Sequence, residues 1–314
     1  MVEMSIWAVV LLVRAVRGYH MRLHKKSEPF LFLLLPMVVY IAVVSIPIIF
    51  SVYYSFMDWN GISDMTFVGF RNYAKMFQDE NLWICMVNNL KYTVINVVYQ
   101  VGIGLLMAIL VERISKGNNL IRVLFFTPVI VSSMAMSQTF KKLLGINPDG
   151  VMNALLEAVG LGDHKVAFLA SMEITLYVVA IVEAYKFSGL YLVVFHSAFT
   201  SVDTEVLEAA RIDGANGFQV YTRIKLPLIK GIIISSVILV INGTLKAFEV
   251  PFILTNGGPG YTSELAATYM YKMSFNNMDY GYGSALSILI VFECVVIIGI
   301  IMKLTQRAEK GGKK

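Results

Sequence analysis

Charged side chains inside long apolar segments are the residues of this sequence that first point to chemistry. Glu183 and Lys186 lie three positions apart in one apolar segment. Lys246 and Glu249 have the same spacing in another, and Glu293 stands in a third. A charge at the centre of a bilayer costs about 2.5–3.5 kcal/mol on insertion scales, so such residues face protein or water. Either some of them line a path for a polar solute, or they pair within a helix or contact another subunit.

Polar and aromatic side chains accompany these charges. Tyr177 and Tyr185 flank Glu183, and Asn242 precedes Lys246. A tyrosine ring packs on the C–H face of a sugar, whose hydroxyl groups need polar partners. Tyrosines are equally common as packing residues, and that alternative stays open. The predicted solute-path residues are Tyr177, Glu183, Tyr185, Lys186, Asn242 and Lys246.

The composition shows which elements must position these residues. Of 314 residues, 57% are hydrophobic and only 15% are charged, whereas a soluble domain carries about 25% charged residues. The excess apolar surface therefore faces lipid. A spanning helix needs about 20 mostly apolar residues, and six such helices are predicted. The spans are 29–56, 92–113, 121–143, 171–198, 229–252 and 280–304.

The distribution of Lys and Arg orients the chain. Most of the 26 basic residues fall in the segments that lie inside if the N-terminus is inside, and positive charge marks the cytoplasmic side. Both termini are therefore predicted to be cytoplasmic, with a basic tail at 306–314. Within the N-terminal segment 1–27, the apolar stretch 4–13 is too short to span and is followed by a basic cluster. It is predicted to be an interfacial helix, with a loosely inserted seventh segment as the alternative.

The inner loop 200–228 is predicted to form two short helices. Asp203 or Ser201 can cap the first, and Gly214 can end it in a left-handed conformation. A second helix follows from Asn216, and Pro227 is predicted to stop it.

The spacing of residues in this loop matches a known signature. The pattern is Glu-Ala-Ala, three residues, Gly, nine residues, Ile, one residue and Leu-Pro. It resembles the cytoplasmic signature loop of permease subunits of binding-protein-dependent ABC importers. The residues that this resemblance implies for coupling to an ATPase are Glu208, Ala209, Ala210, Asp213, Gly214, Ile224, Leu226 and Pro227.

Other motifs narrow the resemblance. The segments 67–73, 126–128, 147–150 and 254–259 are similar to those of carbohydrate-type permeases. The Gly-Gly-Pro element resembles the first partner of a heterodimeric pair, as in maltose, multiple-sugar and glycerol-phosphate systems. The resemblance covers residues 28–305 and implies docking of a solute-binding protein at the outer face. The implied docking residues are Asn147, Pro148, Asp149, Gly257, Gly258 and Pro259.

The resemblance implies an all-α, six-span permease domain of the type I ABC importer fold, with a cytoplasmic coupling helix, in a bacterial cytoplasmic membrane. It also implies a second permease, two ATPase copies and an external solute-binding protein. The chain has no Gly-x4-Gly-Lys-Ser/Thr phosphate loop. It is therefore expected not to be an enzyme and to hold no cofactor, with ATP and Mg²⁺ bound by the partner ATPase.

Two other transport functions remain open. One is a secondary transporter driven by an ion gradient, with Glu183 or Glu293 as the relay. The other is an ABC importer for a non-sugar solute such as a polyol phosphate. An intramembrane enzyme finds no support, because the four histidines and two cysteines lack metal-ligand spacing, and no metal site is expected.

Overall fold

The computed structural model describes residues 28–114, 116–146 and 149–311. The chain divides after Ser51 into two compact units. The described part of the first unit is helical and consists of α2 (Glu28–Tyr40), the π-helical turn η1 (Ile41–Ser45) and the start of α3 (Ile46–Ser55). The predicted N-terminal segment 1–27, with its interfacial helix, lies outside the described residues.

The second unit is a helical bundle built around one long helix. This helix runs through α5 (Glu80–Asn96), the π-helical turn η2 (Val97–Val101) and α6 (Gly102–Glu112). α10 (Thr175–Thr200) packs against α5 and α6, and α14 (Lys230–Thr244) packs against α5 and η2. The other helices are α4 (Arg71–Gln78), α7 (Asn118–Ile130), α8 (Ser133–Leu144), α9 (Val151–Ala158), η3 (Gly162–His164), α11 (Thr204–Ile212), α12 (Gly217–Gln219), η4 (Val220–Lys225), α13 (Leu226–Leu228), α15 (Glu249–Thr255), α16 (Ala266–Tyr271), η5 (Lys272–Asn276) and α17 (Tyr280–Gly311).

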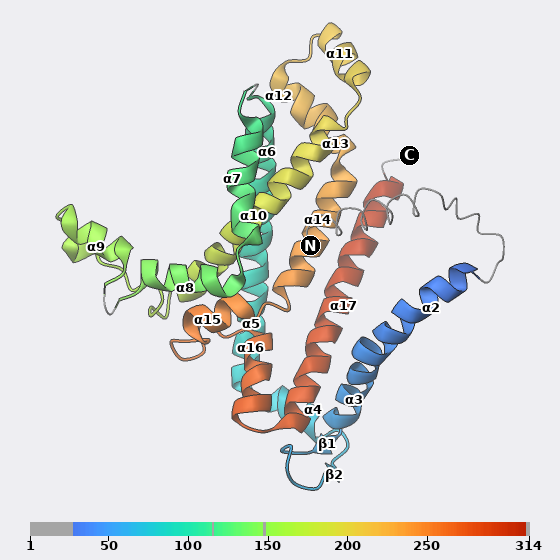
Figure 1. Cartoon of the computed structure of the whole chain (residues 1–314), viewed down its shortest axis with the longest axis vertical. Helices are drawn as coiled ribbons and strands as arrows, with labels where there is room; N and C mark the ends of the chain where they lie inside the picture. Colours follow the sequence, from blue (N-terminus) through green and yellow to red (C-terminus); the bar gives the residue numbers. More distant parts are fainter. Residues whose placement is uncertain (1–27, 115, 147–148, 312–314) are drawn as a thin grey trace, which may run out of the picture. The chain divides into compact units, whose positions relative to one another are not determined.

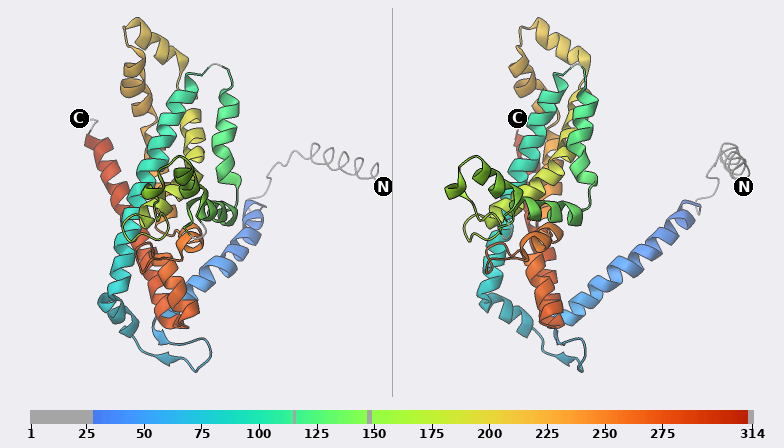
Figure 2. Two further views of the ribbon diagram at one scale, coloured as in Figure 1. Left: turned by 90° about the vertical axis from the view of Figure 1, so that its left-hand side faces the viewer. Right: turned by 60° about the vertical axis from the view of Figure 1, so that its left-hand side comes forward.

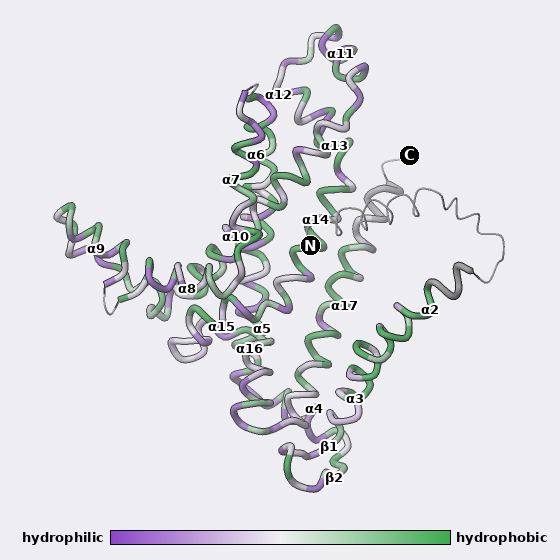
Figure 3. The backbone as a smooth tube through the Cα atoms, in the orientation of Figure 1, coloured by the Kyte–Doolittle hydropathy of each residue, from purple (hydrophilic) through white to green (hydrophobic). Residues whose placement is uncertain are grey.

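The loops gather at opposite ends of this bundle. The short antiparallel strands β1 (Met57–Asp58) and β2 (Thr66–Phe67) lie at one end with α4, and α11 lies at the other end with the turn between α6 and α7 (Figure 1). The loops predicted to be outer and inner are thereby separated. Hydrophobic residues dominate the middle of α6, α14 and α17, whereas hydrophobic and hydrophilic residues are mixed along α11 (Figure 3).

Two of the six predicted spans differ from straight helices. The span predicted over 121–143 is α7 followed by α8, bent by 96°. Ser132 caps α8 by accepting a hydrogen bond from the backbone N–H of Ala135 at 3.2 Å, and this cap begins a new helix direction. As a result α8 and α9 extend sideways from the bundle in Figure 1, and in the left-hand view of Figure 2 they point toward the viewer.

The span predicted over 229–252 is also interrupted. α14 ends at Thr244 and α15 begins at Glu249, so the predicted single helix is wrong. The helical stretch 217–228 meets α14 at a 67° bend. Pro227 does not stop the second short helix, because it lies in the first turn of α13, where proline needs no N–H partner. In the described part of the chain, four helices can span a membrane unaided, and the count is six if each bent pair is one span.

Close helix approaches hold the bundle together. A Cβ atom on Gly189 of α10 would lie 1.9 Å from the carbonyl oxygen of Phe125 in α7. A Cβ atom on Gly104 of α6 would lie 2.7 Å from the Cβ of Tyr191 in α10. Small residues at such contacts let helix backbones approach closely in membranes. α6, α7 and α10 are therefore tightly packed neighbours.

Candidate functional site

The loop 200–228, here called the coupling loop, begins with a well-capped helix. The Asp203 side chain accepts from the backbone N–H of Glu205 at 3.1 Å, so Asp203 rather than Ser201 caps α11. At the other end Gly214 has φ +82°. Its N–H bonds to Arg211, and the N–H of Ala215 bonds to Ala210 at 2.9 Å. These two bonds form a Schellman motif, which favours glycine at the left-handed position.

The surface of α11 is open to a partner. No residue of this helix is buried. Glu208 and Ala209 are both exposed, and within the described part of the chain the Glu208 carboxylate has no hydrogen-bond or ion-pair partner. Asp213 and Gly214 are likewise exposed. Four of the predicted coupling residues, Glu208, Ala209, Asp213 and Gly214, therefore lie on one accessible elbow, whereas Ala210 is half-buried.

The second half of the coupling loop is anchored instead of exposed. Asn216 and Gln219 form a capping box, and the π-helical turn η4 follows. Ile224 and Leu226 are half-buried, and Leu226 packs against the apolar cluster between α6, α10 and α14. The loop thus has a free first helix and a fixed second half.

Three residues that anchor the loop were not predicted. Glu112, at the end of α6, forms an ion pair with Lys225 and accepts a hydrogen bond from the Tyr221 hydroxyl at 2.8 Å. In the sequence Lys225 counts only as one of many inner-side basic residues. The available signal was Glu112 itself, an acid at the end of a predicted span among basic inner segments.

Glu183 and Lys186 do not pair with each other. The Tyr92 hydroxyl donates to Glu183 Oε2 at 2.6 Å. Lys186 Nζ donates to the carbonyl of Val131 at 3.0 Å and to Ser133 Oγ at 2.8 Å. The alternative of pairing within their helix is therefore wrong, because each charge bonds to a different neighbouring helix.

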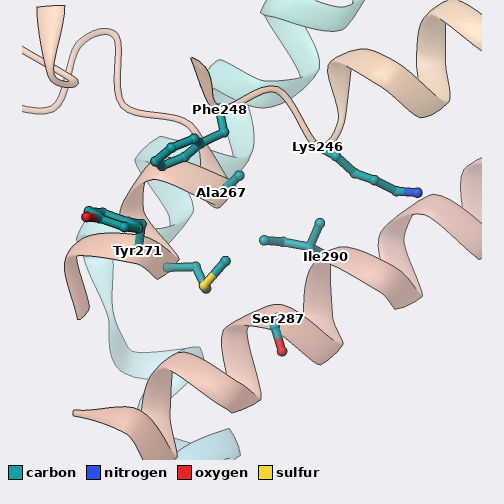
Figure 4. Close-up of a pocket in the computed structure, with 7 residues that line it drawn as sticks. Lys246, Phe248, Ala267, Tyr271, Ser287 and Ile290 are labelled. Carbon is teal, nitrogen blue, oxygen red and sulfur yellow. The ribbon is translucent and has the colours of Figure 1, made fainter. Parts of the chain in front are cut away.

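The other predicted solute-path residues lie on open surfaces. Tyr177 and Tyr185 are 47% and 49% exposed. Lys246 lies in the interruption between α14 and α15 and lines two neighbouring cavities of about 360 and 420 Å³. Asn242 lines the second of these. Figure 4 shows Lys246 with Phe248 and Tyr271 around the first cavity. Non-helical backbone at membrane depth is tolerated where it lines a cavity or is buried in protein, and in this interruption Lys246 and Phe248 line the first cavity.

The predicted docking residues fall in two separate loops. Asn147 and Pro148 lie outside the described residues, and Asp149 forms an ion pair with Lys165 at 2.5 Å. In the other loop Gly257 has φ +79°, and a Cβ there would lie 1.8 Å from Glu264 Oε2.

The Gly-Gly-Pro loop is firmly attached to the bundle. Asn88 of α5 donates to the carbonyls of Tyr261 and Glu264 at 2.8 and 3.1 Å. Ser263 Oγ donates to the carbonyl of Gly258 at 2.6 Å. Gly258 and Pro259 are half-buried, so the loop presents a fixed shape beside α15, in the half of the bundle away from α11 (Figure 1).

Apolar helices long enough to span a membrane, with an exposed elbow at one end of the bundle, are the features of a polytopic membrane protein. Residues 100–310 match the family model described as "Binding-protein-dependent transport system inner membrane component". The chain belongs to this family and is an inner-membrane permease component of an ABC transporter.

Individual relatives agree with this assignment. "Probable ABC transporter permease protein YurN" of Bacillus subtilis is 33% identical over 285 residues, covering 90% of this chain and 95% of YurN. "Multiple sugar-binding transport system permease protein MsmF" of Streptococcus mutans is 28% identical, covering 88% and 95%. A crystal structure of a bacterial ABC transporter for import of the acidic polysaccharide alginate contains a chain that superposes with TM-score 0.78 at 22% identity, covering 90% of this chain and 96% of that one. This likeness confirms the all-α permease fold.

Proposed function

We propose that this chain is the membrane-spanning subunit of an ATP-driven importer that moves a sugar or oligosaccharide into the cytoplasm. Sugar relatives such as MsmF support the solute class. The single observation that carries the ATP-driven mechanism is the exposed α11, with Glu208 unpaired and Gly214 in the left-handed region. A helix that is capped at both ends and left uncovered is suited to docking on another protein.

In this proposal the end that carries α11 faces the cytoplasm, as do both termini. A second permease completes the path, two copies of a separate ATPase bind ATP and Mg²⁺, and an external solute-binding protein delivers the sugar to the opposite end. Glu208 offers its carboxylate to a cation on the ATPase, an interaction that strengthens when water is excluded. Movement of the docked loop then changes the side of the membrane to which the solute cavity opens. The change occurs by rocking of rigid bodies.

Co-purification and uptake test this proposal together. The tagged chain, extracted in mild detergent, is expected to bring with it an ATPase and a second permease. Glu208→Lys reverses the docking charge, and sugar uptake should fall more than about tenfold, since losing one partner of a desolvated pair costs 2–5 kcal/mol or more. Gly214→Asp should also reduce uptake, because it adds a side chain at φ +82°.

The matched control is Glu205→Lys, which reverses another exposed acid on the same helix. It should retain uptake and assembly. Wild-type uptake in both Glu208→Lys and Gly214→Asp would contradict the coupling role. A lone chain whose transport follows a proton or sodium gradient would instead establish a secondary transporter with Glu183 or Glu293 as relay. Uptake of a polyol phosphate but no sugar would correct the solute class.

A further inference from the structure

A buried ion pair holds the second half of the coupling loop. The Lys225 side chain is 6% exposed and that of its partner Glu112 is 19% exposed. The Tyr221 hydroxyl occupies the other carboxylate oxygen of Glu112 at 2.8 Å. Removing one member of a buried pair leaves an uncompensated charge, which is strongly unfavourable. The contact therefore resists separation of η4 from the end of α6.

Ring contacts extend this cluster to α10. Lys225 Nζ lies 5.1 Å from the ring centroid of Tyr221 and 5.9 Å from that of Phe199. Arg113 Cζ lies 5.5 Å from the Tyr221 ring centroid, and the Phe199 and Tyr221 rings meet edge to face. Cations over aromatic faces add attraction. The end of α6, the end of α10 and η4 thus form one cluster.

The first half of the coupling loop starts from the same pair of helices. α10 ends at Thr200, and α11 begins at Thr204. α10 and α6 approach so closely at Gly104 that a Cβ atom would meet the backbone of Tyr191 at 3.1 Å. Closely packed interiors have low compressibility and transmit strain, so we expect these two helices to move together. Both ends of the coupling loop are therefore held by the α6–α10 pair, one through the chain and one through Glu112.

The connection from the loop to α14 is different. The helical stretch 217–228 meets α14 at a 67° bend, and Ile229 between them has φ −92° and ψ 9°. Beyond the bend, a Cβ on Gly231 would touch nothing within 4 Å. This junction interrupts the helix and leaves the Gly231 side of α14 open, and we expect bending at such an interruption.

We propose that Glu112 is a positioning residue that fixes the coupling loop to the α6–α10 pair, so that the loop and these two helices move as one body and bend against α14 at Ile229. The inference rests on the proposed coupling function. It adds that the motion of the coupling loop passes to α6 and α10. Tyr221 and Lys225 are the groups through which Glu112 acts.

The first test measures sugar uptake per ATP hydrolysed by the complete importer in vesicles. Lys225→Met breaks the pair, and the ratio should fall about tenfold while the amount of assembled complex is unchanged. Exchanging the charges in Glu112→Lys/Lys225→Glu should restore most of the ratio. The matched control is Arg223→Met, which removes an exposed cation from the same π-helical turn and should leave the ratio unchanged.

If Lys225→Met does not accumulate, uptake per ATP is measured in the double variant Glu112→Gln/Lys225→Met instead, because it leaves no unpaired buried charge. A merely structural pair would lower the amount of complex without changing uptake per ATP. A wild-type ratio in the variant that assembles would overturn the proposal.

The second test measures distances between spin labels in the same complex, with buried Cys85 and Cys294 replaced by alanine. One pair joins Glu205→Cys on α11 to Leu110→Cys on α6, and the other joins Glu205→Cys to Leu239→Cys on α14. Leu110 and Leu239 are 47% and 63% exposed, so both accept labels. Between the nucleotide-free and ATP-trapped states, the Glu205–Leu110 distance should stay constant and the Glu205–Leu239 distance should change.

Two outcomes separate this inference from the proposed function. If the complex contains the ATPase but the Glu205–Leu110 distance changes as much as the other, the rigid attachment is wrong and the importer assignment stands. If no ATPase accompanies the chain, the proposed function fails and this inference fails with it.

Discussion

Replacing Gly189 with alanine tests the packing that joins α7 to α10. The new Cβ would lie 1.9 Å from the Phe125 carbonyl oxygen and 2.5 Å from its carbonyl carbon. Because both atoms belong to the backbone of a facing helix, no side-chain rotation relieves the contact, and α7 must move away. Overpacking costs about 1–3 kcal/mol, while alanine gains about 0.5–1 kcal/mol over glycine within a helix. The difference leaves a net destabilisation of up to about 2.5 kcal/mol.

Thermal unfolding in detergent, followed by size-exclusion chromatography of the heated sample, measures this effect. Gly189→Ala should lower the midpoint by several degrees. The matched control is Gly243→Ala in α14, where a Cβ meets nothing within 4 Å, and its midpoint should be unchanged or slightly higher. Equal midpoints for the two variants would refute the close approach of α7 and α10.

Three further changes have definite expected outcomes. Tyr92→Phe removes the hydroxyl that donates to buried Glu183, which should destabilise the chain by about 1–3 kcal/mol in the same unfolding assay; an unchanged midpoint would show that this bond contributes nothing. Gly257→Ala should prevent accumulation of folded chain, judged by monodisperse elution, because its Cβ would overlap Glu264; a normal yield would contradict the fixed shape of this loop. Burial alone would raise the pKa of Asp79, but donors from Tyr282, Tyr269 and two backbone N–H groups together hold it below its ordinary value of 3.8. Its carboxylate therefore stabilises the fold above that value, and the contribution is lost as pH falls through the lower folded pKa. Asp79→Asn should flatten this acid dependence, and an unaltered pH profile of the midpoint would argue against it.

The coupling loop is the part of the molecule that sequence reasoning describes best. Its signals are local: Asp203 caps α11, and Gly214 occupies a left-handed position that glycine favours. The family pattern adds the spacing, and the structure shows α11 exposed. Local backbone chemistry and a strict motif together make this region predictable.

The bends were not predictable from hydropathy. The apolar residues of α7 and the start of α8 form a continuous run, so the pattern reports the length of a span and not its direction. In the sequence, Ser132 looks like any other serine in a membrane segment. Its role as a helix cap is recognised only once the directions of α7 and α8 are known. Likewise, the charge of Lys186 signals a buried partner, but the carbonyl of Val131 that it bonds is 55 residues away and leaves no trace in composition. Hydrogen-bond partners that are far apart in the sequence therefore cannot be predicted from it.

The continuous helix from Glu80 to Glu112 has 33 residues, a length of about 50 Å at 1.5 Å per residue. Near its beginning, Asn88 is bonded to the Gly-Gly-Pro loop, and at its end Glu112 is bonded to the coupling loop. One continuous helix therefore joins the Gly-Gly-Pro loop to the coupling loop. Its π-helical turn at Val97–Val101 is the place where this helix can bend, since wider helical turns interrupt the regular ladder of hydrogen bonds.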